Sequence, residues 1–175
     1  MLFVEAVLVI FLLVFCALFL FLFDSVFGGL DFKSSPSAVN QAAVVIRKYK
    51  NQGLLLDLGS ARGGFARAIS VYCPNLEVIG LDDSWIRVIY SRLASIFYKN
   101  IRFLKQDIFF ANLSAADFIY IYLPKEFMPK LESKLRKELK SGGLIITYRV
   151  NFTDWQPAEV YDLPKSEKLY IYKNA

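Results

Sequence analysis

The sequence contains no histidine and only two cysteines among its 175 residues. Without histidine the chain cannot form a Ser-His-Asp triad, a histidine general base or a zinc site with histidine ligands. Cys16 lies in an apolar run and Cys73 lies far along the chain, which argues against a disulfide framework and a cysteine-ligated metal. We therefore predict that the protein carries no metal and works with carboxylates, hydroxyls, aromatic rings and its backbone.

Charge is almost absent from the first 23 residues, where Glu5 is the one charged side chain. About 22 helical residues span ~33 Å, which is enough for a bilayer core of ~30 Å. A cleaved secretory signal is the alternative, but it needs a basic start, a shorter apolar core and a small-residue cleavage site. We predict a transmembrane anchor at 1–23, a linker at 24–36 that includes Gly28 and Gly29, and one catalytic domain at 37–175.

Basic residues follow the apolar run and none precedes it, as Lys33, Arg47 and Lys48 illustrate. The positive-inside rule then predicts a single-pass membrane protein whose globular domain faces the cytoplasm. The chain has 21 basic and 16 acidic residues, a net charge of +5, scattered rather than massed. Such a charge favours an anionic membrane surface or an acidic partner and indicates nucleic acid only weakly.

Strand-like and helix-like segments alternate after the linker, which predicts a mostly parallel sheet with helices on both faces, a Rossmann-like α/β domain. A closing hairpin around Pro164–Glu167 follows, which a nicotinamide-binding domain does not normally show. The predicted helices begin near Pro36 and cover Ala61–Tyr72, Ser84–Tyr98 and Lys125–Leu139. The predicted strands are Leu54–Gly59, Val78–Asp82, Ile101–Gln106, Phe118–Leu123, Leu144–Val150, Ala158–Leu163 and Lys168–Lys173.

The turn after the first strand is the strongest local signal, because it passes through Gly59, Ser60, Ala61 and Gly63 into a helix. Small residues let the backbone approach a ligand, and the helix N-terminus offers it unpaired N–H groups. The spacing suits either S-adenosylmethionine or a dinucleotide. Asp57, at the end of the strand, favours S-adenosylmethionine, since its carboxylate suits a cationic amino group and repels a pyrophosphate. A turn aspartate without a ligand is the alternative.

Two further strands also end in carboxylates. Asp82 is placed to accept hydrogen bonds from a ribose, with Asp83 beside it either near the cofactor or capping the next helix. Asp107 is placed to accept from an adenine amino group, and Ile108 offers a backbone N–H, although a simple strand-end turn explains Asp107 equally well. Because the carboxyl ends of parallel strands line one crevice, the three acids together predict a cofactor site.

The fourth strand ends at Tyr122 and Pro124, beside the expected position of the reactive methyl group. Methyl transfer from a sulfonium needs an aligned, desolvated and uncharged nucleophile more than an acid–base pair, so the lack of histidine is no objection. A buried strand aromatic is the alternative for Tyr122. This strand end lacks the Asn/Asp-Pro-Pro-aromatic run of amino-methylating DNA enzymes, so we predict no nucleic-acid partner.

From about Phe32 to Tyr172 the sequence resembles the small membrane-anchored protein-lysine methyltransferases of mitochondria and their prokaryotic relatives. The resemblance implies a lysine acceptor on an integral membrane protein near the bilayer. Ala61 departs from the family pattern, which has a glycine there. The matching segments are Ser35-Pro36, Asp57–Ser60, Gly80 with Asp82, Tyr90–Arg92, Met128–Leu131, Lys134-Leu135 and Arg149–Phe152 with Trp155 and Pro157.

Lysine has a pKa of ~10.4 in water, so the site must desolvate or deprotonate it before attack. We predict that Tyr122, Phe152 and Trp155 line an apolar channel for this purpose, with core packing as the alternative for Phe152 and Trp155. Two other functions stay open. One is methylation of a lipid or quinone headgroup, and the other is a membrane-tethered, non-catalytic cofactor-binding or scaffold module.

Overall fold

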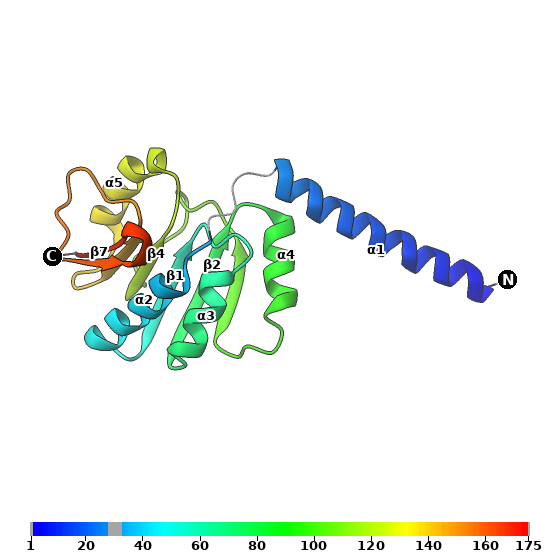
Figure 1. The fold of residues 1–175 in the computed structure, drawn as a ribbon, viewed down its shortest axis with the longest axis horizontal. Coiled ribbons are helices and arrows are strands. Elements are labelled where there is room, and N and C mark those ends of the chain that lie inside the picture. Colours follow the sequence, from blue (N-terminus) through cyan, green and yellow to red (C-terminus); the bar gives the residue numbers. More distant parts are fainter. Residues whose placement is uncertain (1, 28–32, 175) are drawn as a thin grey trace. The chain divides into compact units, whose positions relative to one another are not determined.

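The computed structural model describes residues 2–27 and 33–174 (Figure 1). The chain divides into two compact units, Met1–Asp31 and Phe32–Ala175. Part of the predicted linker, residues 28–32 with Gly28 and Gly29, lies outside the described residues.

The first unit holds one helix, α1 (Leu2–Phe27). Its segment Val4–Leu22 has a mean hydropathy of 3.0 and is long and apolar enough to cross a membrane. The side chains from Val4 to Leu20 are exposed in the structure. The helix is therefore a candidate membrane span.

The second unit is built on one seven-stranded sheet in the order β3-β2-β1-β4-β5-β7-β6. β1 to β5 pair in parallel, and β7 is antiparallel to both of its neighbours. The strand order reverses beside β1, where ligands bind in open sheets of this kind. The predicted Rossmann-like fold and its terminal hairpin are confirmed. The strands are β1 (Gly53–Leu58), β2 (Leu76–Asp82), β3 (Ile101–Lys105), β4 (Phe118–Ile121), β5 (Leu144–Tyr148), β6 (Glu159–Leu163) and β7 (Glu167–Lys173).

Helices cover both faces of the sheet. One face packs against α2 (Pro36–Tyr49), α3 (Gly64–Tyr72) and α4 (Trp85–Ala94). The other packs against α5 (Met128–Glu138), which follows a 3₁₀ turn at Lys125–Phe127. The alternation of residues in β4 shows the division: Tyr120 points into the first core and Ile121 into the second.

Two helices differ from their predicted bounds for local reasons. α3 begins at Gly64 and not at Ala61, because Ala61 (φ 48°) and Gly63 (φ 71°) are in the left-handed region, which no α-helix contains. α4 ends at Ala94 and not at Tyr98, because the chain turns after Ser95, whose carbonyl accepts from the N–H of Tyr98 at 2.9 Å.

A phenylalanine ring fills the space beneath the turn between β1 and α3. The side chain of Phe103 lies where a Cβ on Gly80 would stand, 2.5 Å from its Cδ1 atom. The same Cβ would stand 2.8 Å from the Oγ of Ser60, and Gly63 has the same close approach to the Phe103 ring. The glycines at 63 and 80 thus allow the turn, β2 and β3 to pack together.

We expect Gly80→Ala to destabilise the domain by about 1–3 kcal/mol, because the added methyl group overpacks this contact. Thermal or denaturant unfolding of the full-length chain in detergent measures the effect. Gly64→Ala is the matched control: its Cβ would meet nothing within 4 Å. That variant should keep its stability or gain up to ~1 kcal/mol from helix propensity. Equal stability of the two variants would contradict the packing argument.

Candidate functional site

The turn after β1 is fastened to the end of β2 by its own backbone. The N–H groups of Gly59 and Ser60 both donate to the carbonyl of Leu81, at 2.9 and 2.8 Å. The N–H of Ala61 donates to the Oδ2 of Asp82 at 2.8 Å. The predicted turn residues and the predicted ribose acid are therefore brought together at the carboxyl edge of the sheet.

Asp57 lies directly beneath this turn and is 3% exposed. One carboxylate oxygen accepts a hydrogen bond from the backbone N–H of Ala66 in the first turn of α3. Within the described residues, its Oδ2 has no hydrogen-bond partner, and neither has the buried Oγ of Ser60. Buried polar atoms without partners are costly, which indicates that a ligand supplies the missing contacts.

Burial raises the pKa of Asp57 to about 8, and the nearby carboxylate of Asp82 raises it further, while the Ala66 N–H opposes the shift. The acid is therefore mostly protonated at neutral pH while no ligand is bound. A cation placed at its free oxygen would favour the ionised form. The site thus suits a positively charged ligand group.

Asp82 is buried at the end of β2, and each of its oxygens already accepts one backbone N–H, from Ala61 and from Ser84. A carboxylate oxygen can accept a second hydrogen bond, so a ribose hydroxyl remains an acceptable partner. Burial also raises the pKa of Asp82, opposed by the Ser84 N–H and by Arg87. Asp83 is exposed, and Ser84, not Asp83, caps α4 by accepting from the N–H of Arg87.

Asp107 is exposed and stabilises the turn after β3. Its Oδ1 accepts from the N–H of Phe109 at 2.8 Å, and its carbonyl accepts from the N–H of Phe110 at 3.0 Å. The strand-end turn that the sequence left open is therefore present. Ile108 is partly buried against the second core. The adenine-binding role of Asp107 and Ile108 stays a prediction.

Aromatic and hydroxyl groups gather where β4 and β5 end. The hydroxyl of Tyr122 accepts from the Nη1 of Arg149 at 2.9 Å, and its ring packs edge-on against Tyr148 with centroids 4.6 Å apart. The hydroxyl of Tyr120 bonds Ser34 at 2.6 Å, and its ring stacks on Phe65. Pro124 follows with extended backbone (ψ 146°) and begins the 3₁₀ turn before α5.

Glu167 of β7 joins this cluster to the start of α2. Its Oε2 accepts from the Oγ of Ser35 at 2.8 Å, and its Oε1 pairs with Arg149 at 3.2 Å. Hydrogen bonds from Tyr148 and Ser35 lower the pKa of Glu167. Sequence reasoning missed Tyr120, Tyr148 and Glu167. The tyrosines at the ends of two apolar strands were a usable signal, whereas nothing local placed Glu167 beside Ser35.

The structure does not bring Phe152 and Trp155 together with Tyr122. Phe152 is 1% exposed in the core on the α5 face, where it packs against Tyr172 and Trp155. Trp155 is partly buried there, with the guanidinium of Arg136 4.4 Å from its ring. Tyr122 packs against the core on the opposite face. Core packing, the alternative left open by the sequence, describes the surroundings of Phe152.

Comparisons with known proteins agree with this geometry. Residues 57–159 match the family described as the ANTKMT methyltransferase domain. The chain is similar to the ATP synthase-subunit lysine N-methyltransferases of Xenopus laevis (25% identical over 72% of this chain and 57% of the relative) and Mus musculus (27% over 70% and 50%). It therefore spans about half the length of the curated relatives it matches.

A solved structure shares the fold. The RNA methyltransferase from Salinibacter ruber, in complex with S-adenosyl-L-homocysteine, superposes with a TM-score of 0.74 at 19% identity. The superposition covers 81% of this chain and 93% of that one. The likeness confirms the fold class.

Because Asp57 is mostly protonated in the empty domain, binding of a cationic ligand at its free oxygen should release about one proton at pH 7. Affinity for S-adenosylmethionine should rise with pH and level off above about 8, where Asp57 is already ionised. Calorimetric titration in buffers of different ionisation enthalpy measures the proton. Asp57→Asn should bind more weakly and release no proton, and proton release unchanged in that variant would exclude Asp57 as its source.

Proposed function

The chain belongs to the ANTKMT methyltransferase domain family, which makes it an S-adenosylmethionine-dependent methyltransferase, and we propose that its acceptor is the side-chain amine of a lysine on a membrane-associated protein. The buried, unpartnered oxygen of Asp57 is the observation that carries the cofactor site. The names of the curated relatives support lysine as the acceptor. The candidate span in α1 supports an acceptor at a membrane.

The residues at the switch point fit the cofactor. Asp57 would hold the amino group of its methionine part, and the buried hydroxyl of Ser60, in the turn above, would complete that contact. Asp82 would hold the ribose with its remaining lone pairs. When bound, S-adenosylmethionine supplies a methyl group on a positively charged sulfur.

The tyrosines at the ends of β4 and β5 would prepare the amine. A lysine enters as an ammonium ion, and aromatic faces attract such a cation while displacing its water. Loss of water lowers the pKa of an amine, so the proton is released more readily before the transfer. Arg149 fixes the Tyr122 ring through its hydroxyl, and Tyr148 supports it from the side. Their proposed role is to desolvate and orient the acceptor.

Arg149 has φ 65°, a conformation that a non-glycine residue adopts at a cost. The guanidinium contacts Tyr122, Glu167 and the face of Tyr148, and these contacts fix it in place. Such strain at the end of β5 is consistent with a site whose geometry is maintained for function.

We expect the full-length chain, incubated with membranes and S-adenosylmethionine labelled in its methyl group, to transfer label to protein. Acid hydrolysis of the labelled band should yield methyl-lysine. Label confined to the lipid extract would instead identify a headgroup methyltransferase. Cofactor binding without any transfer to protein or lipid would support the non-catalytic alternative.

Tyr122→Phe tests the acceptor site separately. It removes the hydrogen bond to Arg149 and should lower kcat by about 3- to 10-fold while cofactor affinity stays unchanged. Tyr161→Phe is the matched control, since Tyr161 bonds Glu159 on β6, away from the site. Equal rates for both variants would remove Tyr122 from the proposed site.

A further inference from the structure

Helix α4 turns its large apolar side chains outward. Trp85, Ile89 and Leu93 lie at helical spacing on its outer face and are 57, 52 and 68% exposed. Ile96 and Phe97, just after the helix, are 71 and 94% exposed. The helix buries Val88 and Ser91 instead. We call these five exposed residues the α4 stripe, and so large a continuous apolar surface indicates a partner.

The charges around the α4 stripe have one sign. The segment from Ser84 to Lys105 contains no acidic residue and five basic ones, namely Arg87, Arg92, Lys99, Arg102 and Lys105. The Nζ of Lys105 lies 5.7 Å from the centre of the Trp85 ring, so a cation lies beside the stripe itself. Arg102 pairs with Glu77 at 3.5 Å, an exposed pair that contributes little.

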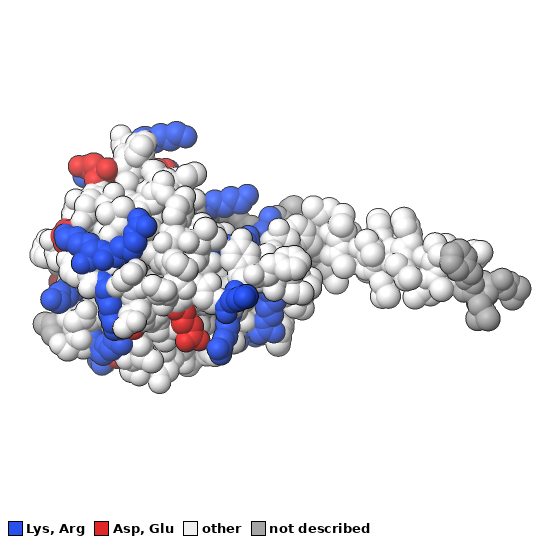
Figure 2. Space-filling view, turned by 90° about the horizontal axis from the view of Figure 1, so that it is seen from below, with Lys and Arg blue, Asp and Glu red and all other residues white. Residues whose placement is uncertain are grey.

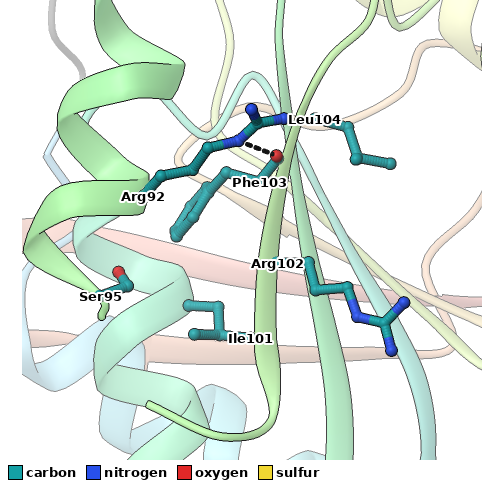
Figure 3. A pocket seen from close by; sticks show the side chains of 6 residues that line it. All are labelled: Arg92, Ser95, Ile101, Arg102, Phe103 and Leu104. Atoms are coloured by element: carbon teal, nitrogen blue, oxygen red, sulfur yellow. Dashed lines mark hydrogen bonds between the residues drawn. The ribbon is translucent and has the colours of Figure 1, made fainter. Parts of the chain in front are cut away.

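The basic side chains continue onto the neighbouring edge of the sheet. Figure 3 shows a cavity of about 340 Å³ between α4 and the edge strand β3, with Arg92 above it and Arg102 below. Arg92 donates to the carbonyl of Phe103 at 2.8 Å, which holds its guanidinium at the surface. Figure 2 shows basic side chains spread over the visible face of the domain, with fewer acidic ones among them.

We propose that the α4 stripe docks on a bilayer that contains anionic lipids, so that the domain lies on the membrane through a contact separate from α1. An apolar face with tryptophan, flanked by lysine and arginine, is the composition of helices that lie in a membrane interface. The candidate span supplies the second argument, because it would keep this chain at a bilayer. A second copy of the chain is the competing occupant.

This inference rests on the proposed membrane location and deepens the proposed function. α4 starts two residues after Asp82 has contacted the cofactor turn. Docking along α4 would therefore hold the carboxyl edge of the sheet at the membrane surface. The acceptor class then narrows to lysines that lie close to the lipid headgroups.

The two tryptophans of the chain provide the probe, since Trp85 belongs to the stripe and Trp155 packs in the core on the opposite face. The full-length chain is reconstituted into phosphatidylcholine vesicles that contain phosphatidylglycerol, with or without bromine on the acyl chains. Bromine should roughly halve the emission of Trp85, because an interfacial side chain reaches the acyl boundary. The emission of Trp155 should not change.

Trp85→Phe leaves Trp155 as the probe, and the difference between wild type and this variant gives Trp85 alone. Leu93→Glu should abolish the quenching, and high salt should reduce it. Val71→Glu is the matched control, because Val71 is 64% exposed on α3, outside the stripe. Quenching equal in Leu93→Glu and wild type overturns the proposal. So does an unquenched Trp85, with or without crosslinking of two copies through α4.

The same samples separate this proposal from the proposed function. Cofactor affinity should be unchanged in Leu93→Glu, whereas transfer to a membrane-embedded acceptor should fall by about 10-fold or more. Quenching without any methyl transfer would contradict the function and support the docking. Methyl transfer without quenching would do the opposite.

Discussion

Three hydrogen bonds attach the turn after β1 to the end of β2, and the candidate site depends on this attachment. Two backbone N–H groups share the carbonyl of Leu81, and the third reaches the carboxylate of Asp82. The turn thereby closes over Asp57 and removes it from water. Asp82 consequently has two functions, since the oxygens that would bind ribose also shape the turn that covers its neighbour.

Ala61 shows how strongly this attachment constrains the backbone. Its φ of 48° is a glycine-like conformation that costs an alanine about 1 kcal/mol. Its N–H is bound to Asp82 and its carbonyl accepts from the Oγ of Ser91, so both sides of the residue are held. The backbone keeps the left-handed turn that a glycine would adopt, and the departure from the family pattern leaves that turn in place.

The sequence predicted the architecture because its signals are local. Apolar strand runs, small-residue turns and helix caps placed all seven strands and the acids at their ends, and Asp57 and Asp82 do meet at one edge. Contacts between distant segments were not predictable. Glu167 and Ser35 are 132 residues apart, and Phe152 follows an apolar strand as a channel residue would, yet lies in the core. Side-chain direction beyond a strand end has no period that sequence could reveal.

The distribution of exposed apolar residues follows from the same construction. The inner face of α4 has only small or short contacts to make, because Gly80 and Phe103 already fill the space between β2 and β3. Its large side chains therefore have no room inside and remain outside, where water disfavours them. A sequence under selection for solubility alone would replace them with polar residues. Their presence is explained if this flank meets lipid, and a tether in the same chain would raise the local concentration of that surface enough for a weak interface to suffice.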